Sequence, residues 1–511
     1  MRSYPMLIDG VEETGKGWSY VVHASDLVRD LDASFTFKRQ LELNKLDPFA
    51  PHERRIAGRC AWGGVDECRR AVAAAARARD EFARFPLKDR VRLAADAHDR
   101  LKGRAEELME ILVSEGHPRR LAQWEISGML AGSCPETLEW LSGQIEQEFR
   151  RGPNLLKIVR KPDGVVCVNP PQNAAASNSF MSLQALLAGN TIVVRAPQSA
   201  PLGVMYVHHE ILRPILDEWD VPTGTLNIIS GEGRAITESW LTDPLVDSLL
   251  FFGDSKTGLR VGQKCMENGK KAVLELSGND GLVVWRDADL ELAAEALLEC
   301  FYGSSQICMV PKFAIVHPSV ADAFLERFIS RVRKLEPGYP EDPDTILTPV
   351  FKVGQFVEML AEAKQEGADV LCGGGRIEVD GTPSYTGLFV EPTVIRVSGF
   401  ELADRLTCVR EETFFPLLPI VVPEPDSEDQ LIDRMIEFLN SNQYGLRNSL
   451  WSQSENTIER FTAEVRNGGI LKVNDSHLGF LPCLGTHGGS GRSGGPDGEM
   501  KYASVRLSRR Q

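Results

Sequence analysis

One cysteine lies in a short run of small and polar residues that could present a nucleophile. In Ser305-Gln306-Ile307-Cys308-Met309 the thiol follows residues 290–301, a segment of helical character. A helix dipole or a nearby cation would favour the thiolate, which is the nucleophilic form. A single cysteine is more commonly a small buried hydrophobic residue. The local sequence therefore leaves Cys308 open to a catalytic or a packing role.

An acid and a glycine-flanked turn each follow an apolar run that we predict to be a strand. Leu274-Glu275-Leu276-Ser277-Gly278 places the acid at the end of one run. The carboxyl ends of strands in open α/β sheets face the ligand crevice, so Glu275 could be a general base or simply a solvated carboxylate. The turn at residues 252–258 could bring backbone N–H groups near a phosphate, although it fits neither GxGxxG nor a Walker loop.

The elements that would position these residues alternate between short apolar strands and helices. We predict strands at residues 165–168, 192–194, 226–229, 248–251 and 272–275, with helical segments at 203–216, 234–241 and 257–265. This alternation predicts βαβ units in a mostly parallel, doubly wound sheet of nucleotide-binding type.

Helices and a second α/β region flank that predicted sheet. Residues 64–150 are typical of helices, including 71–83 and 91–115. A second series comprises strands at 313–316, 369–371, 390, 417–422 and 470–473, with a helix at 320–335. Residues 155–160 and 502–507 alternate like half-exposed strands, and we expect them to form an edge that another subunit completes.

Composition excludes several classes of partner. The chain has 511 residues with 57 basic and 72 acidic side chains, a net charge of −15, which argues against a nucleic-acid groove or an anionic membrane surface. No apolar run is long enough for a membrane span, and no signal peptide is recognisable. The ten cysteines form no CxxC, and the nine histidines form no metal signature. We therefore expect no bound metal and a reducing, cytoplasmic setting.

Taken in order, these pieces resemble the aldehyde dehydrogenase superfamily over residues 60–507. Ser305–Cys308 resembles the family's GQxC, Leu274–Gly278 resembles LELGG, and Phe251–Asp254 resembles FTGS. Further matches are residues 164–168 with 171–173 (GVVGVISPWNFP), 187–191 (LAAGNT), 390–393, 410–416, 442–446 and the glycine-rich stretch 488–494. The number and order of these matches carry the resemblance.

The resemblance implies an α/β fold with three parts. We expect a Rossmann-type NAD(P)-binding domain at residues 1–148 and 164–282, an α/β catalytic domain at 283–481, and a small β oligomerisation arm and tail at 149–163 and 482–511. Because the family associates through the arm and tail strands, we expect a homodimer or homotetramer.

The resemblance also implies a reaction, the NAD(P)-dependent oxidation of a small-molecule aldehyde to a carboxylic acid. Cys308 would be the nucleophile, and the side chain of Asn173 with the Cys308 backbone N–H would form the oxyanion hole. Glu275 would activate the water that hydrolyses the thioester. A CoA-acylating enzyme is the first alternative, although such enzymes often lack this glutamate. A non-catalytic binding protein on the same fold is the second.

The family's cofactor positions are only partly kept. By resemblance, Glu412 would hold the nicotinamide ribose, Phe414 would pack beside the ring, and Gly231 and Gly253 would line the pyrophosphate. Arg195 and Gln198 replace the usual lysine and glutamate, and a neutral Gln198 beside a cation would not repel a 2′-phosphate. We therefore expect NADP in preference to NAD. The sequence offers no physical account of Asp254, which stands where the family often has serine.

The substrate side departs most clearly from the family. Gln172-Asn173-Ala174-Ala175 replaces Trp-Asn-Phe-Pro, which favours a roomier tunnel for a bulky aldehyde unless Phe180 or Phe480 fills the volume. The other residues that we assign to the substrate pocket by resemblance are Ile307, Met309 and His477. The natural aldehyde itself does not follow from these residues.

Overall fold

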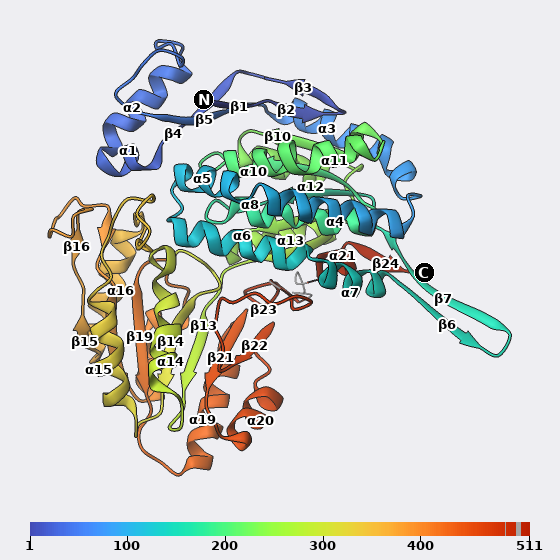
Figure 1. Ribbon diagram of the computed structural model, residues 1–511. Coiled ribbons are helices and arrows are strands. Elements are labelled where there is room, and N and C mark those ends of the chain that lie inside the picture. The colour runs from blue at the N-terminus through green and yellow to red at the C-terminus, as the bar shows by residue number, and fades with distance from the viewer. Residues whose placement is uncertain (486, 497–501) are drawn as a thin grey trace. The chain divides into compact units, whose positions relative to one another are not determined.

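Five parallel strands form the centre of the first of two compact units in the computed structural model (Figure 1). The structure describes residues 1–485, 487–496 and 502–511. The first unit comprises Met1–Glu275 with described parts of residues 480–486 and 499–511, and the second comprises Leu276–Gly479 with described parts of residues 487–498. The predicted tail segment 482–511 therefore lies partly outside the described residues.

The sheet of the first unit has the strand order of a dinucleotide-binding fold. Its order is β12-β11-β8-β9-β10-β2-β3, so the parallel strands run 5-4-1-2-3 in chain order, with the switch between β8 and β11. β2 and β3 add an antiparallel edge. The bounds are β2 Met6–Ile8, β3 Val11–Glu13, β8 Val165–Asn169, β9 Thr191–Ala196, β10 Leu226–Ser230, β11 Ser248–Phe252 and β12 Lys271–Glu275. The predicted doubly wound sheet is confirmed.

Helices supply the other layers of this unit, and their apolar faces build its core. They are α3 Val65–Phe82, α4 Leu87–Gly103, α5 Ala105–Glu115, α6 Arg119–Ser133, α7 Pro135–Ile145, α8 Ala175–Phe180, α9 Ser182–Ala188, α10 Leu202–Tyr206, α11 Arg213–Glu218, α12 Gly233–Thr242 and α13 Ser255–Glu267. A π-helical segment, Val207–Leu212, joins α10 to α11, and a 3₁₀ turn, Thr223–Thr225, precedes β10. The helical pattern predicted for 91–115 is interrupted at Arg104, which ends α4 and begins α5.

The N-terminal region folds as a small sheet with two helices, for which the sequence offered no prediction. β5 (Ile56–Ala61) pairs with β1 (Arg2–Tyr4) in parallel and with β4 (Trp18–Val22) in antiparallel fashion. Helices α1 (Ala24–Arg29) and α2 (Leu31–Glu42) connect β4 to β5, and Phe37 and Leu41 of α2 pack on Tyr20 and Val22.

The second unit contains its own seven-stranded sheet, of order β15-β18-β19-β14-β13-β21-β22. Its strands are β13 Asp280–Val284, β14 Pro311–Val316, β15 Asp369–Cys372, β18 Thr393–Ser398, β19 Leu417–Val422, β21 Arg447–Trp451 and β22 Ile470–Val473, with short pairs β16 Arg376–Ile377 and β17 Phe389–Val390, and β20 Tyr444–Gly445 and β23 Ser490–Gly491. The helices are α14 Leu290–Leu297, α15 Ala321–Val332, α16 Val353–Glu366, α17 Phe400–Arg405, α18 Thr407–Arg410, α19 Glu428–Ser441 and α20 Glu455–Glu464. The predicted second α/β series is confirmed, and β13, β18 and β21 are additions to it.

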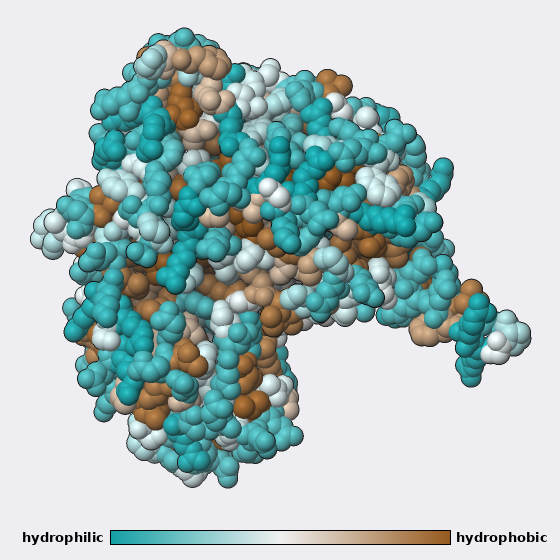
Figure 2. All heavy atoms as spheres, in the orientation of Figure 1, coloured by the Kyte–Doolittle hydropathy of each residue, from teal (hydrophilic) through white to brown (hydrophobic). Residues whose placement is uncertain are grey.

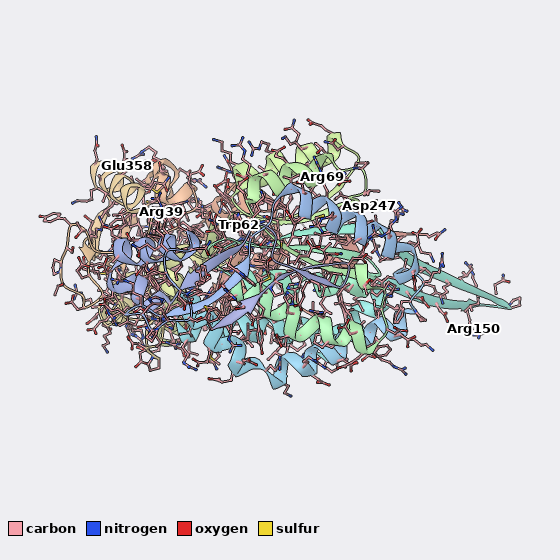
Figure 3. All side chains as sticks on the ribbon, turned by 90° about the horizontal axis from the view of Figure 1, so that it is seen from above. Arg39, Trp62, Arg69, Arg150, Asp247 and Glu358 are labelled. Atoms are coloured by element: carbon pink, nitrogen blue, oxygen red, sulfur yellow. The ribbon has the colours of Figure 1, made fainter. Side chains whose placement is uncertain are left out.

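A hairpin of β6 (Glu146–Arg151) and β7 (Asn154–Pro162) extends from the first unit, with Arg150 near its outer end (Figure 3). Phe149, Leu155 and Leu156 on it are about half exposed, and Figure 2 shows apolar residues beside hydrophilic ones along it. The predicted strand at 155–160 is confirmed.

The strand predicted at 502–507 is wrong. Residues Ala503–Arg506 form helix α21, and the strand that pairs with β7 is β24, Ser508–Arg510. Ala503 and Leu507 are both buried, at the i, i+4 spacing of one helical face. Tyr502 packs on Trp140 with 4.7 Å between ring centroids. These tertiary contacts override the alternating pattern.

Candidate active site

Cys308 lies in the loop between a 3₁₀-type segment, η3 (Leu298–Ser305), and β14, and is partly exposed. The backbone before it is left-handed at three successive residues, with φ of 60° at Gly303, 53° at Ser304 and 60° at Ser305. Such angles are uncommon for serine and store strain, as is typical of functional loops.

The two serine side chains hold this strained backbone. Ser305 Oγ donates to the Cys300 carbonyl at 2.5 Å, and Ser304 Oγ donates to the Thr348 carbonyl at 2.7 Å. Ser305 stands where the resembling motif has glycine, and its positive φ explains the family's preference for glycine there. The backbone that precedes Cys308 is therefore held by hydrogen bonds within the chain.

A buried lysine joins the Cys308 loop to the loop that carries Glu412. Lys312 Nζ donates to the Ser305 carbonyl at 2.6 Å and to the Thr413 carbonyl at 2.9 Å, and lies 5.4 Å from the Phe414 ring centroid. Burial lowers the pKa of Lys312, and negative partners, Glu412 and then Cys308, oppose that shift. A cation interacting with a thiol favours its thiolate form.

Glycine at 278 allows the close contact between two backbone segments of the second unit. A Cβ at Gly278 would lie 2.0 Å from the Cys308 carbonyl oxygen, so no other residue fits there without movement. The Gly278 N–H donates to Glu412 Oε1 at 2.9 Å. Burial raises the pKa of Glu412, and Lys312 opposes the rise. Cys308, Glu412 and Phe414 are thus brought together by Lys312 and Gly278.

Asn173 and Glu275 both belong to the first unit, at the C-terminal edge of its parallel sheet. Glu275 is the last residue of β12, is buried, and pairs with Phe252 of β11. Its carbonyl accepts a hydrogen bond from Gly253 N at 3.1 Å. Asn173 follows β8, the neighbour of β11 in the sheet. The sheet thus collects the predicted base, the predicted oxyanion donor and Gly253 at one edge.

The same edge carries a buried arginine. Arg195, near the end of β9, donates from Nε to Asn169 Oδ1 at 2.9 Å, and Asn169 Nδ2 donates to the Phe252 carbonyl at 3.3 Å. Burial lowers the pKa of Arg195 to about 10, and Glu232 opposes that shift. Sequence reasoning missed Asn169, although a polar residue ending a buried strand was an available signal.

Two acids occupy the starts of the helices that follow β10 and β11. Glu232 caps α12 by accepting from Arg234 N at 2.9 Å and Ala235 N at 2.7 Å, and these bonds lower its pKa. Asp254 caps α13 by accepting from Thr257 N at 2.9 Å. Helix capping is therefore the physical account of Asp254 that the sequence alone did not provide.

Gly231, at the end of β10, is required by the backbone. Its φ is 147°, and a Cβ there would lie 3.0 Å from the Gly63 carbonyl oxygen. The first residue of α12, Gly233, would direct a Cβ to within 3.2 Å of the Arg195 guanidinium. The backbone at Gly231 and Gly233 thus lies very close to neighbouring groups, at the strand end where a dinucleotide fold binds phosphates.

The residues assigned to the substrate pocket are distributed over both units. Ala174 is the N-cap of α8, and Phe480 stacks on Trp124 of α6 with 5.2 Å between ring centroids; both belong to the first unit. Ile307 and Met309 are buried on either side of Cys308 in the second unit.

His477 is enclosed by a polar cluster inside the second unit. Its Nδ1 lies 2.6 Å from Ser449 Oγ, and its Nε2 lies 3.4 Å from Asp280 Oδ2. Burial lowers the pKa of His477 to about 3 and raises that of Asp280 to about 8. The structure therefore gives the ring internal hydrogen-bonding partners, and contact with substrate stays a prediction.

The sheet of the first unit and the cysteine loop of the second unit each indicate a class of protein. A 5-4-1-2-3 parallel sheet with a buried cation and close-approach glycines at its carboxyl edge is a dinucleotide-binding unit. The second unit adds a partly exposed cysteine in a strained loop beside a buried lysine. Among the described residues, no group of three or more His, Cys, Asp or Glu side chains could hold a metal ion.

The chain belongs to the aldehyde dehydrogenase family, whose model matches residues 38–508. It is 28% identical over 460 residues to a 3,6-anhydro-α-L-galactose dehydrogenase of Vibrio sp. strain EJY3, covering 87% of this chain and 92% of that protein. A solved 3,6-anhydro-L-galactose dehydrogenase is 25% identical with a TM-score of 0.78, covering 100% and 99% of the two chains. A glyceraldehyde-3-phosphate dehydrogenase of Methanocaldococcus jannaschii, solved with NADP, is 25% identical with a TM-score of 0.76, covering 91% and 98%.

Family membership establishes the class of reaction. The chain is an oxidoreductase that oxidises an aldehyde to a carboxylic acid, with NAD(P) as the acceptor. The predicted family, fold class and reaction class are confirmed.

Proposed function

We propose that Cys308, Asn173 and Glu275 carry out this oxidation, with the Cys308 thiolate attacking the aldehyde carbon. A C–S bond forms and the carbonyl π pair moves to oxygen, which the Asn173 side-chain amide and the Cys308 backbone N–H stabilise. Each such donor is worth about 3 kcal/mol in comparable sites. The oxyanion of the resulting thiohemiacetal then re-forms the C=O bond, the C–H electron pair leaves as hydride, and a thioester remains on Cys308.

Hydrolysis then completes the reaction on Cys308. NAD(P), when bound, supplies the two-electron acceptor for the hydride. Glu275 takes a proton from a water molecule, whose oxygen attacks the thioester carbon; the C–S bond breaks and the thiolate leaves with its electron pair. The products are the carboxylic acid and the regenerated Cys308 thiolate.

The observation that best supports this assignment is the environment of Cys308 in comparison with the other cysteines. Burial or partial burial raises the pKa of eight of them: 60, 68, 167, 265, 300, 372, 408 and 483. Cys308 is partly exposed, follows a strained segment of backbone and interacts with the Lys312 cation. The test is aldehyde-dependent reduction of NADP and NAD without coenzyme A, compared between the wild type and a Cys308 variant.

The residues at the carboxyl edge of the first unit's sheet fit a dinucleotide. We further propose that the protein prefers NADP to NAD. Arg195 supplies a buried cation, and the close backbone at Gly231 leaves room that a side chain would fill. Gln198 lines a pocket of about 370 Å³ together with Lys16, Trp18, Glu42 and Trp62 of the N-terminal region. A 2′-phosphate beside Gln198 would meet the Lys16 cation and the neutral amide at position 198, and Glu42 is the acid of the same pocket. The likeness to an NADP-bound dehydrogenase supports the same preference.

A charge at position 198 tests the cofactor preference. Gln198→Glu should raise the KM for NADP by about tenfold or more and leave the KM for NAD nearly unchanged, because like charges brought together cost several kcal/mol. Steady-state kinetics with both cofactors measure this. Gln198→Ala, which removes the amide without adding charge, is the control. Equal effects of Gln198→Glu on the two cofactors would refute the placement of Gln198 beside the 2′-phosphate.

Asp254 provides a second test of the cofactor site. Asp254→Ser keeps a good N-cap for α13 but removes a negative charge from a position assigned to the pyrophosphate region. We expect a severalfold lower Kd for NADP, by analogy with roughly 1 kcal/mol for an exposed charge pair, with the melting temperature unchanged. Titration of nicotinamide-cofactor fluorescence measures the Kd. An unchanged Kd would show that Asp254 acts only on its own helix.

The proposal also covers the oligomeric state, the cellular compartment and the size of the substrate. The half-exposed Phe149, Leu155 and Leu156 on the β6–β7 hairpin support a homodimer or homotetramer assembled through this arm. No disulfide links the ten cysteines, all of which lie in described residues, and this supports a cytoplasmic setting. None of the helices in the described residues is long and apolar enough to cross a membrane. The small residues at 174 and 175 support a bulky aldehyde as substrate.

A further inference from the structure

The backbone of Asn173 is held by a histidine that the motif comparison did not assign. His117 Nε2 lies 2.9 Å from the Asn173 carbonyl oxygen. A carbonyl can only accept, so Nε2 carries the proton that is donated to it. Nδ1 is buried and has no hydrogen-bond partner among the described residues. The ring therefore makes its directed contact with Asn173.

A buried glutamate holds the chain on the other side of Asn173. Glu125 Oε1, on α6, accepts from Ser177 N at 2.9 Å, in the first turn of α8. The N-cap of α8 is Ala174, which has no side chain that could cap the helix. Glu125 thus supplies from another helix the acceptor that a serine or aspartate N-cap would provide.

The two side chains are neighbours, although Glu125 Oε2 has no hydrogen-bond partner among the described residues. His117 Nε2 lies 3.5 Å from Glu125 Oε2, and the side chains are 11% and 1% exposed. His117 itself is fixed between α5 and α6: Gly116, with φ of 115°, ends α5, and His117 N donates to the Leu112 carbonyl at 3.0 Å. Because both helices are packed in the core, the pair has little freedom to move.

We propose that His117 and Glu125 are positioning residues for the oxyanion hole: together they fix the backbone on both sides of Asn173 and so aim its side-chain amide. This inference rests on the proposed role of Asn173. Oxyanion donors act only when they are preorganised at the position of the developing charge, and misplacement by about 1 Å costs roughly a hundredfold in rate.

A neighbouring acid provides a matched control. Glu115, two residues before His117, accepts from Leu202 N at 2.6 Å and Gly203 N at 2.8 Å, at the start of α10. It therefore makes the same kind of helix-start contact as Glu125, but to a segment that does not contain Asn173. Its carboxyl group also interacts electrostatically with His117 and Glu125, so a Glu115 variant also controls for a change of charge near the pair. Glu115→Met removes this acceptor and should lower the melting temperature without lowering kcat/KM by more than about twofold.

The experiment is a double-mutant cycle between positions 117 and 173. We would measure kcat/KM for aldehyde oxidation, the rate of Cys308 alkylation by iodoacetamide, and the melting temperature of each variant. His117→Met should lower kcat/KM by roughly 10- to 100-fold with alkylation unchanged. Asn173→Ala should lower it by about 100-fold or more. His117→Met added to Asn173→Ala should have less than about a twofold further effect, because the group being positioned is already absent.

Conservative variants separate loss of the hydrogen bond from other effects of substitution. His117→Gln retains a donor near the place of Nε2 and should recover most of the activity lost in His117→Met. Glu125→Gln likewise keeps an acceptor for Ser177 N and should keep most of the activity, whereas Glu125→Met removes that acceptor and should behave like His117→Met. Losses that multiply in the double variant, or an equal loss from Glu115→Met, would overturn the inference. Full activity of Asn173→Ala would instead overturn the proposed function of Asn173, so the two failures are distinguishable.

Discussion

Cys308→Ser is expected to lower aldehyde-dependent reduction of NADP and NAD by about 10⁴-fold or more. Losses of this size follow removal of a covalent nucleophile, because the remaining binding and oxyanion groups retain only a small part of the rate enhancement. A serine hydroxyl has nearly the same size but does not ionise near neutral pH, so the variant removes the thiolate with little change in packing. Absorbance of the reduced nicotinamide measures the rate.

A matched cysteine distinguishes loss of the nucleophile from loss of the fold. Cys300 is fully buried in η3, eight positions before Cys308, and burial raises its pKa well above the ordinary value. Cys300→Ser should retain most of the activity even if it lowers the melting temperature. Activity that survives Cys308→Ser, or is lost equally in Cys300→Ser, would contradict the assignment of the nucleophile.

Glu275→Gln is expected to separate hydride transfer from hydrolysis. The first turnover should still produce reduced nicotinamide, as a burst close to the enzyme concentration, while steady turnover falls by about 10²- to 10⁴-fold because the water lacks its general base. Stopped-flow absorbance measures the burst, and intact-mass spectrometry should find the acyl group on the protein.

An added nucleophile provides the control for Glu275→Gln. Hydroxylamine cleaves thioesters without a protein base, so it should restore turnover in Glu275→Gln and yield the hydroxamate. If the burst is absent and hydroxylamine has no effect, Glu275 acts before the thioester forms, and the proposed role in hydrolysis is wrong.

Much of the fold could be predicted because its sheets are buried on both faces. Strands such as Val165–Asn169 and Thr191–Ala196 are apolar almost throughout, which is typical of parallel strands covered by helices. The tail was mispredicted because its alternating letters fit a strand, whereas the Tyr502–Trp140 contact and the buried pair Ala503 and Leu507 favour a helix. The Tyr502–Trp140 contact joins residues hundreds of positions apart and leaves no local signal.

The candidate site could be inferred from sequence where motifs carry it, and could not where only tertiary contacts do. Cys308, Glu275 and Asn173 stand in ordered motifs that the sequence shows directly. Asp254 was treated as a cofactor residue, although an acid three positions before Thr257 at a helix start is also a capping signal. His117 and Asn173 are 56 positions apart and meet only through the folded backbone, so local patterns could not reveal that contact.

The most direct test of the central claim is the stoichiometry of products formed from an aldehyde and NADP in the absence of coenzyme A. The account predicts one carboxylic acid for each NADPH, with turnover that depends on Cys308. Reduction that occurs only when coenzyme A is present, with an acyl-CoA as the product, would contradict hydrolysis through Glu275. No reduction under either condition, across aliphatic, aromatic and bulky aldehydes, would contradict the proposed oxidation itself.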